Sequence, residues 1–205
     1  MLLDERMYYV EKRHEHGESV ESLGWSEKGQ QIRFAKLANQ IRFNICNDTI
    51  LDVGCGHADL YLFLSLLHGF EPHQYFGIDA MQEAIDCARE KYPKIPVDNL
   101  STLDLDSVVE NEFKPTWIFC SGTMSFKSEF DTMTFIGKMW EMSEKGIAFN
   151  CLSSLKDKGH VTEDPVIWKD PSAILKFCMT LTRNVRIDHS YLPHDFTIQM
   201  FKDIQ

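Results

Sequence analysis

Apolar residues follow two recurring patterns from residue 29 onward. Short runs in which nearly every position is apolar predict strands that are buried on both faces. Longer segments with apolar positions at helical spacing predict helices, several of which stop before a glycine or proline. The short runs predict strands at 49–53, 75–78, 95–97, 116–120 and 147–152. The longer segments predict helices at 29–43, 58–68, 81–91, 128–145 and 171–181.

The last part of the chain has a different pattern, in which apolar and polar residues alternate. Val185, Ile187, His189 and Tyr191 occupy every second position of one stretch, and Phe196, Ile198 and Met200 occupy every second position of the next, with polar residues between them. Because Leu192–Asp195 lies between these two stretches, the pattern predicts an antiparallel hairpin. Together the elements predict an α/β fold with a mostly parallel sheet and helices on both faces. Such a sheet binds ligands at the carboxyl ends of its strands.

Residues 1–28 are polar, rich in Glu, His and Gly, and show no sustained periodicity. We therefore expect a mobile arm or lid at 1–28, followed by one domain at 29–205. A chain of 205 residues is long enough to bury a full hydrophobic core as a single domain. No apolar run reaches the length of about 18 residues that a membrane span requires, so no membrane association is expected.

The charge and the cysteines narrow the class of protein. Lys and Arg number 21 and Asp and Glu number 31, which gives a formal net charge of −10. This balance argues against a nucleic-acid partner, because neutralising phosphates requires clustered Lys and Arg. The 6 cysteines form no Cys-x-x-Cys pair and mostly lie in apolar runs. They predict buried, reduced thiols of a cytoplasmic protein and no metal site.

The segment Leu51–Leu60 carries the most specific chemistry, since an apolar strand runs into a glycine-rich turn and then a helix. Gly54 and Gly56 let the backbone turn sharply and approach a ligand with no Cβ in the way. Asp79 closes the next strand, where a carboxylate can accept both hydroxyls of an adenosine ribose. The dinucleotide pattern fails because Asp59 stands in place of its third glycine, and the Walker pattern does not occur. The turn therefore fits a sulfonium cofactor with an amino-acid tail better than it fits a pyrophosphate.

On these residues the chain resembles the class I, seven-stranded S-adenosylmethionine-dependent methyltransferases, most of all those that act on small metabolites. Leu51–Gly56 matches the family's first motif, Gly77–Asp79 matches its second, and the terminal hairpin matches its antiparallel last strand. The resemblance covers about residues 30–205. It implies a Rossmann-like sheet of seven strands and S-adenosyl-L-methionine as the cofactor, with S-adenosyl-L-homocysteine as the product. Ala58 stands where the family often has a third glycine.

The resemblance also implies which positions hold the cofactor. Those toward its amino-acid end are Arg33, Asp52, Gly54, Cys55, Gly56, Cys120 and Ser121. Those toward the ribose and adenine are Asp79, Ala80, Met81, Leu100 and either Asp98 or Asn99. In this scheme Asp79 holds the ribose, Asp52 helps to place the ammonium group, and Arg33 or Gln31 binds the carboxylate.

The methyl acceptor is expected above the strand ends and under the N-terminal arm. Candidate substrate contacts are Tyr8, Trp25, Met124, Phe126 and Asn150. Candidate general bases are His14, His16 and His160, because histidine titrates near neutral pH. The leading hypothesis is methyl transfer to oxygen or nitrogen of a small polar metabolite. A protein or RNA acceptor and a catalytically idle cofactor-binding module are the alternatives, and the sequence leaves a monomer and a homodimer equally open.

Overall fold

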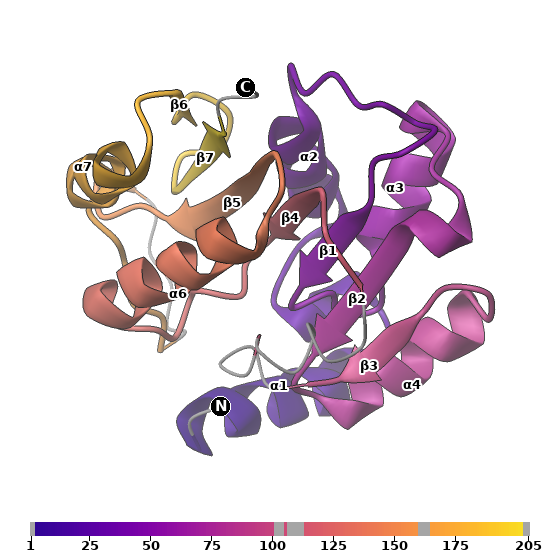
Figure 1. Ribbon diagram of the computed structural model, residues 1–205. Coiled ribbons are helices and arrows are strands. Elements are labelled where there is room, and N and C mark those ends of the chain that lie inside the picture. The colour runs from indigo at the N-terminus through magenta and orange to yellow at the C-terminus, as the bar shows by residue number, and fades with distance from the viewer. Residues whose placement is uncertain (1–2, 101–104, 106–112, 160–164, 203–205) are drawn as a thin grey trace.

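The computed structural model describes residues 3–100, 105, 113–159 and 165–202. They contain a seven-stranded sheet of order β3-β2-β1-β4-β5-β7-β6 (Figure 1). Its strands are β1 (Ile50–Val53), β2 (Tyr75–Asp79), β3 (Val97–Asn99), β4 (Trp117–Cys120), β5 (Gly146–Leu152), β6 (Val185–Asp188) and β7 (Asp195–Phe201). β1 to β5 are parallel, whereas β7 runs antiparallel between β5 and β6. The predicted α/β class, the mostly parallel seven-stranded sheet and the terminal hairpin are confirmed.

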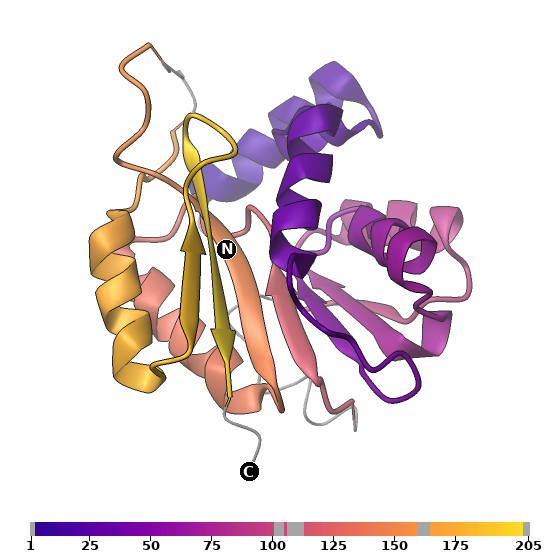
Figure 2. The same cartoon turned by 90° about the horizontal axis from the view of Figure 1, so that it is seen from above.

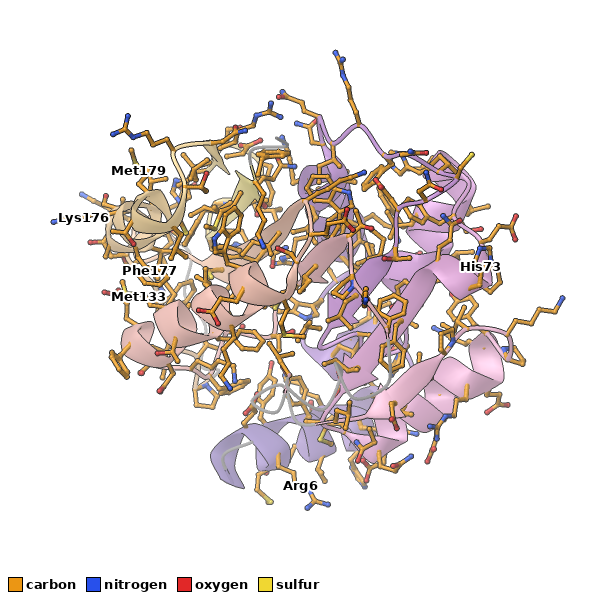
Figure 3. The ribbon with its side chains drawn as sticks, viewed as in Figure 1. Arg6, His73, Met133, Lys176, Phe177 and Met179 are labelled. Atoms are coloured by element: carbon orange, nitrogen blue, oxygen red, sulfur yellow. The ribbon has the colours of Figure 1, made fainter. Side chains whose placement is uncertain are left out.

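The helices cover the sheet in two groups, one on each face (Figure 2). The first group is α2 (Glu27–Ala38), α3 (Asp59–His68) and α4 (Gln82–Lys91), and the second is α6 (Glu129–Met142) and α7 (Pro171–Leu181). Phe34, Leu64 and Ile85 of the first group share one core with β1, β2 and β4. Phe135 and Ile174 of the second group form the other core with the opposite side chains of the same strands. Lys176 and Met179 lie on the outer side of α7 (Figure 3). No helix within the described ranges is long and apolar enough to cross a membrane.

Several element boundaries differ from the predicted ones for local reasons. α2 begins two residues before the predicted start because the Ser26 hydroxyl accepts a hydrogen bond from the Gly29 amide at 3.2 Å. It ends at Ala38, soon before Gln40 adopts a left-handed conformation with φ 59°. β3 lies slightly later than predicted because its pairing register sets Val97 opposite Gly77.

The N-terminal segment contains regular structure that the sequence pattern did not predict: α1 (Leu3–His16) and a 3-10 helix, η1 (Val20–Leu23). The inner side of α1 is aromatic, and the rings of Tyr8 and Tyr9 lie 5.1 and 5.8 Å from the Phe126 ring. Met7 and Val10 are exposed, so the apolar residues of this helix trace no single stripe. Figure 1 shows α1 at the sheet edge toward which the arrows of β1 and β2 point, while Arg6 extends outward from it (Figure 3). The absence of sustained periodicity in residues 1–28 therefore did not reveal these helices, and the role of this segment as an arm or lid stays a prediction.

Candidate functional site

The turn after β1 brings two other loops against the sheet edge. Gly54 has φ 75°, and a Cβ built there would lie 1.9 Å from the Thr123 Oγ1 atom. Thr123 follows β4 and donates its hydroxyl to the Val53 carbonyl at 3.0 Å. Gly56 has φ 54°, and a Cβ there would lie 2.8 Å from the Leu23 side chain of η1. Both glycines are therefore required by close protein neighbours on either side of the turn.

Ala58 completes the turn in a conformation that usually belongs to glycine. Its φ is 59° and its ψ is 30°, and it directly precedes α3. A left-handed alanine costs about 1–2 kcal/mol relative to an ordinary backbone conformation. The turn therefore keeps a left-handed residue where the family often has its third glycine.

Asp79 closes β2 and holds two loops together through its carboxylate. Oδ2 accepts a hydrogen bond from the Gly56 amide at 2.9 Å, and Oδ1 accepts one from the Met81 amide at 2.8 Å. Burial raises the pKa of Asp79, while the Met81 and Gly56 amides act in the opposite direction. Because a carboxylate has about four acceptor positions, this side chain can still accept from a ligand hydroxyl.

Asp52 lies on β1 under the glycine turn and is 2% exposed. Its Oδ2 accepts a hydrogen bond from the Tyr75 hydroxyl at 2.6 Å. Burial raises the pKa of Asp52 to about 7, despite the Tyr75 hydrogen bond that lowers it. A buried carboxylate of this kind favours a positively charged group beside it.

A cleft opens over these carboxylates, which we call the acidic cleft. Its lining includes four carboxylates, from Glu5, Asp52, Asp79 and Glu83, and its volume is about 100 Å³. The remaining lining residues are Tyr9, Arg13, Ser22, Leu23, Trp25, Gln30, Arg33, Phe34, Gly54, Cys55, Gly56, His57, Ala80, Met81, Ala84, Ser121, Gly122 and Thr123. Five segments therefore meet here: α1 with η1, α2, the β1–α3 turn, the loop after β2 and the loop after β4.

Most residues assigned to the cofactor line the acidic cleft, namely Arg33, Asp52, Gly54, Cys55, Gly56, Asp79, Ala80, Met81 and Ser121. Cys120 is fully buried below it. Asp98, Asn99 and Leu100 lie beside the cleft and do not line it. Asn99 Nδ2 donates to the Asp79 carbonyl at 3.1 Å, and the Leu100 amide donates to the same oxygen at 3.0 Å. These two residues thus brace the end of β2, and their contact with adenine stays a prediction.

His57 is a lining residue that the sequence reasoning missed, although it directly follows Gly56 in the motif. It is 1% exposed, and its Nδ1 has no hydrogen-bond partner among the described residues. Burial lowers the pKa of His57, which favours the neutral imidazole. Because Nδ1 is itself buried, it does not open onto the cleft, although other atoms of the residue line it.

A second cleft adjoins the first, and we call it the aromatic cleft. Its volume is about 260 Å³, and it shares Tyr9, Leu23, Trp25 and Arg33 with the acidic cleft. Its other lining residues are Tyr8, Gly24, Ser26, Gly29, Ser125, Phe126, Leu152, Val166, Trp168, Leu192 and His194. No Asp or Glu lines it within the part of the chain that the structure describes.

Arg33 lies where the two clefts meet and is 3% exposed. Its Nε donates to the Asp195 carboxylate, and its Nη2 lies 3.5 Å from His194 Nε2. Its guanidinium carbon also lies 3.9 Å from the Trp25 ring centroid. Burial raises the pKa of Asp195 to about 6, and the Arg33 charge limits that rise. Arg33 is therefore a buried, paired group, and its predicted role toward a cofactor carboxylate is untested.

The other candidates separate into those that reach a cleft and those that do not. Tyr8, Trp25 and Phe126 line the aromatic cleft. Met124 is 1% exposed within the core, and Asn150 lies beneath the loop after β4, where its Oδ1 accepts from the Gly122 amide at 2.9 Å. These two side chains therefore line neither cleft.

Of the three histidine candidates, the two that the structure describes reach neither cleft. His14 and His16 are exposed on the last turn of α1 and line neither cleft. His160 lies outside the described residues. His194 does line the aromatic cleft, and its place in the hairpin loop gave no sequence signal. Within the described ranges no group of His, Cys, Asp and Glu could hold a metal ion.

Comparisons with known proteins agree on the fold. No protein-family model matches the chain. It is 26% identical over 162 residues to the protein named "Putative methyltransferase Rv1506c" from Mycobacterium tuberculosis, covering 75% of this chain and 93% of that protein. The structure of magnesium protoporphyrin IX methyltransferase from Synechocystis with bound SAM matches with a TM-score of 0.69 and 12% identity, over 99% of each chain. The pyocyanin biosynthetic protein PhzM matches with a TM-score of 0.67 and 9% identity, over 95% of this chain and 62% of PhzM.

The chain therefore has the Rossmann-like fold of the class I S-adenosylmethionine-dependent methyltransferases. The resemblance drawn from the glycine turn and the acidic end of the second strand is confirmed at this level.

Proposed function

We propose that this protein is an S-adenosyl-L-methionine-dependent methyltransferase that modifies oxygen or nitrogen of a small polar metabolite. The observation that carries the proposal is the acidic cleft at the carboxyl edge of the sheet, where Asp52 and Asp79 lie beneath and beside the glycine turn. The name of the Mycobacterium tuberculosis relative and the SAM-bound state of the Synechocystis structure support the same cofactor.

The residues of the acidic cleft fit the charge pattern of this cofactor. Asp52 is a buried carboxylate that favours a cation, so it suits the ammonium group. Asp79 keeps acceptor capacity beyond its two backbone contacts, so it suits the ribose hydroxyls. When bound, S-adenosyl-L-methionine supplies an electrophilic methyl group on a positively charged sulfur.

The N-terminal segment covers part of the acidic cleft and is placed to control entry of the cofactor. Small-molecule sites commonly have volumes of about 300–1,000 Å³, and the acidic cleft measures only about 100 Å³. Tyr9 and Arg13 of α1 line it, and Arg13 Nη1 donates to the Glu83 carbonyl of α4 at 3.1 Å. We therefore propose that residues 1–28 act as a lid, which opens for exchange and excludes water from the transfer when closed.

Binding of the product tests the cofactor assignment. Calorimetric titration with S-adenosyl-L-homocysteine should give a micromolar dissociation constant. Absence of binding to the folded protein would overturn the proposal.

The acceptor class is tested by transfer of a deuterated methyl group from labelled cofactor to a cell extract separated into small-molecule, RNA and protein fractions. Label in the small-molecule fraction supports the proposal. Label confined to the RNA or protein fraction would overturn the proposed acceptor class and identify a macromolecular acceptor. Cofactor binding with no label in any fraction identifies an idle binding module.

A further inference from the structure

We infer that the aromatic cleft binds a single-ring aromatic compound that carries an acidic group, such as a hydroxybenzoate. This inference rests on the proposed function, because it names the class of acceptor for the same site. It is argued from the lining, the size and the charge of the cleft.

Aromatic side chains dominate the walls of this cleft. Tyr8, Tyr9 and Phe126 form one cluster, with ring centroids between 5.1 and 5.8 Å apart. Trp25 and Trp168 line the same cleft. Rings of this kind bind another ring by offset stacking and edge-to-face contact, which a saturated ring cannot reproduce.

The size of the cleft limits the ligand. An apolar cavity of about 150 Å³ holds benzene, and the aromatic cleft has a volume of about 260 Å³. One ring with small substituents therefore fits.

The charge of the cleft differs from that of the rest of the molecule. The whole chain has a net charge of −10, yet no described carboxylate lines this cleft. Arg33 and His194 do line it, and the Lys156 ammonium lies 3.5 Å from the Trp168 ring centroid. Because Arg33 is already paired with the buried Asp195 carboxylate, the cleft favours an acidic ligand through the remaining N–H donors of Arg33 and through the Lys156 ammonium. A cationic ring compound would find no carboxylate among the described lining residues.

The position of the cleft connects this ligand to the proposed reaction. The two clefts meet at Tyr9, Trp25 and Arg33, so a ring in the aromatic cleft presents one end to the acidic cleft. An oxygen substituent at that end reaches the wall shared with the cofactor site. Burial raises the pKa of Tyr9 well above its usual value, so this phenol stays protonated and can donate to such an oxygen.

Three matched probes test the inference by calorimetry with the protein saturated by S-adenosyl-L-homocysteine. The reference probe is 4-hydroxybenzoate. Relative to it, trans-4-hydroxycyclohexanecarboxylate lacks the aromatic ring but keeps the acid, and 4-hydroxybenzylamine keeps the ring but carries a positive charge. We expect 4-hydroxybenzoate to bind about 3- to 10-fold more tightly than the saturated acid and more tightly than the amine. Equal binding of the two acids, or tighter binding of the amine, would overturn the inference.

Two variants locate the binding site. Trp168→Leu removes a ring from the cleft wall and should abolish the preference for the aromatic acid. Phe130→Leu removes a ring that is 77% exposed on α6 and lines neither cleft, so it should leave the preference unchanged. A preference that survives Trp168→Leu refutes the assignment of this wall to the ligand. Failure of S-adenosyl-L-homocysteine to bind in the first step instead refutes the proposed function, so the two failures are distinct.

Discussion

The acidic cleft and the aromatic cleft share a wall from α1, η1 and α2, and they differ in the elements that complete them. The acidic cleft uses backbone turns at the ends of β1 and β2, where Gly54, Gly56 and Asp79 are fixed by the sheet. The aromatic cleft uses side chains from α1 and from the loops after β4, β5 and β6. The first has four carboxylates in its lining, and the second has none among the described residues.

The difference in carboxylate content between the two clefts matches the charges of a methyl donor and a methyl acceptor. A sulfonium cofactor with an ammonium group suits carboxylates, and an anionic or neutral nucleophile suits a cleft without them. The sheet fixes the donor side, so it tolerates little change. Loops form the acceptor side, where different side chains can accommodate different substrates on one fold.

The rigidity of the donor side gives the largest expected effect. Gly54→Ala should destabilise the protein by about 2–5 kcal/mol, through the left-handed backbone and the collision with Thr123. Gly69→Ala is the matched control, because Gly69 has φ 76° and nothing lies within 4 Å of its added Cβ. It should cost only about 1–2 kcal/mol. Equal costs in urea denaturation would mean that the Thr123 loop moves aside and that the close contact is dispensable.

The same contrast explains what the sequence could predict. The glycine turn and Asp79 lie in short motifs whose geometry is local, so the sequence identifies residues that line one cleft, and their role toward the cofactor stays a prediction. Met124 and Asn150 were expected at the acceptor site because they lie near strand ends in sequence. Adjacency along the chain does not fix the direction of a side chain, and these two lie in the core and beneath a loop.

The acceptor side was less visible in the sequence for a related reason. His194 reaches the aromatic cleft from the hairpin loop, through tertiary packing that no local pattern encodes. The α1 helix was missed because its inner side consists of tyrosines that cover a cleft, with no apolar stripe for a core. The periodicity of apolar residues predicts which residues are buried in the core well, and it predicts which residues line a cleft poorly.

The carboxylate at the end of β2 gives the next largest effect. Asp79→Asn should weaken S-adenosyl-L-homocysteine binding by about 1–3 kcal/mol, because a charged acceptor is lost. Asp98→Asn, at a side chain that is 46% exposed outside the cleft, should change the affinity little. Calorimetry measures both affinities. Thermal melting without ligand separates lost binding from a loosened loop, since Asp79 also accepts from Gly56 and Met81. If Asp98→Asn weakened binding more than Asp79→Asn, the main ribose or adenine contact would lie on β3 and the role given to Asp79 would be wrong.

The buried carboxylate on β1 makes binding depend on pH. Asp52 has a pKa of about 7, and an ammonium group beside it favours the ionised form. Affinity for S-adenosyl-L-homocysteine should therefore rise about tenfold between about pH 6 and pH 8. Because the folded-state pKa lies above its usual value of 3.8, the stability of the free protein should fall as pH rises from about 4 to about 7. Asp52→Asn should remove the pH dependence of binding. It should only reduce the fall in stability, because Asp79 and Asp195 also have raised pKa values. If the variant still binds more tightly at pH 8 than at pH 6, another group causes the dependence.

The smallest effect concerns the last residue of the donor-side turn. Ala58 and Ala88 are both fully buried, but Ala58 has φ 59° and Ala88 lies inside α4. Ala88→Gly should cost about 2 kcal/mol, from helix propensity and a lost methyl group. Ala58→Gly loses a similar methyl group and is relieved of about 1–2 kcal/mol of backbone strain, so its stability in urea should stay near that of the unchanged protein. A loss at Ala58 as large as that at Ala88 would show that the methyl group supports the turn more than the left-handed backbone strains it.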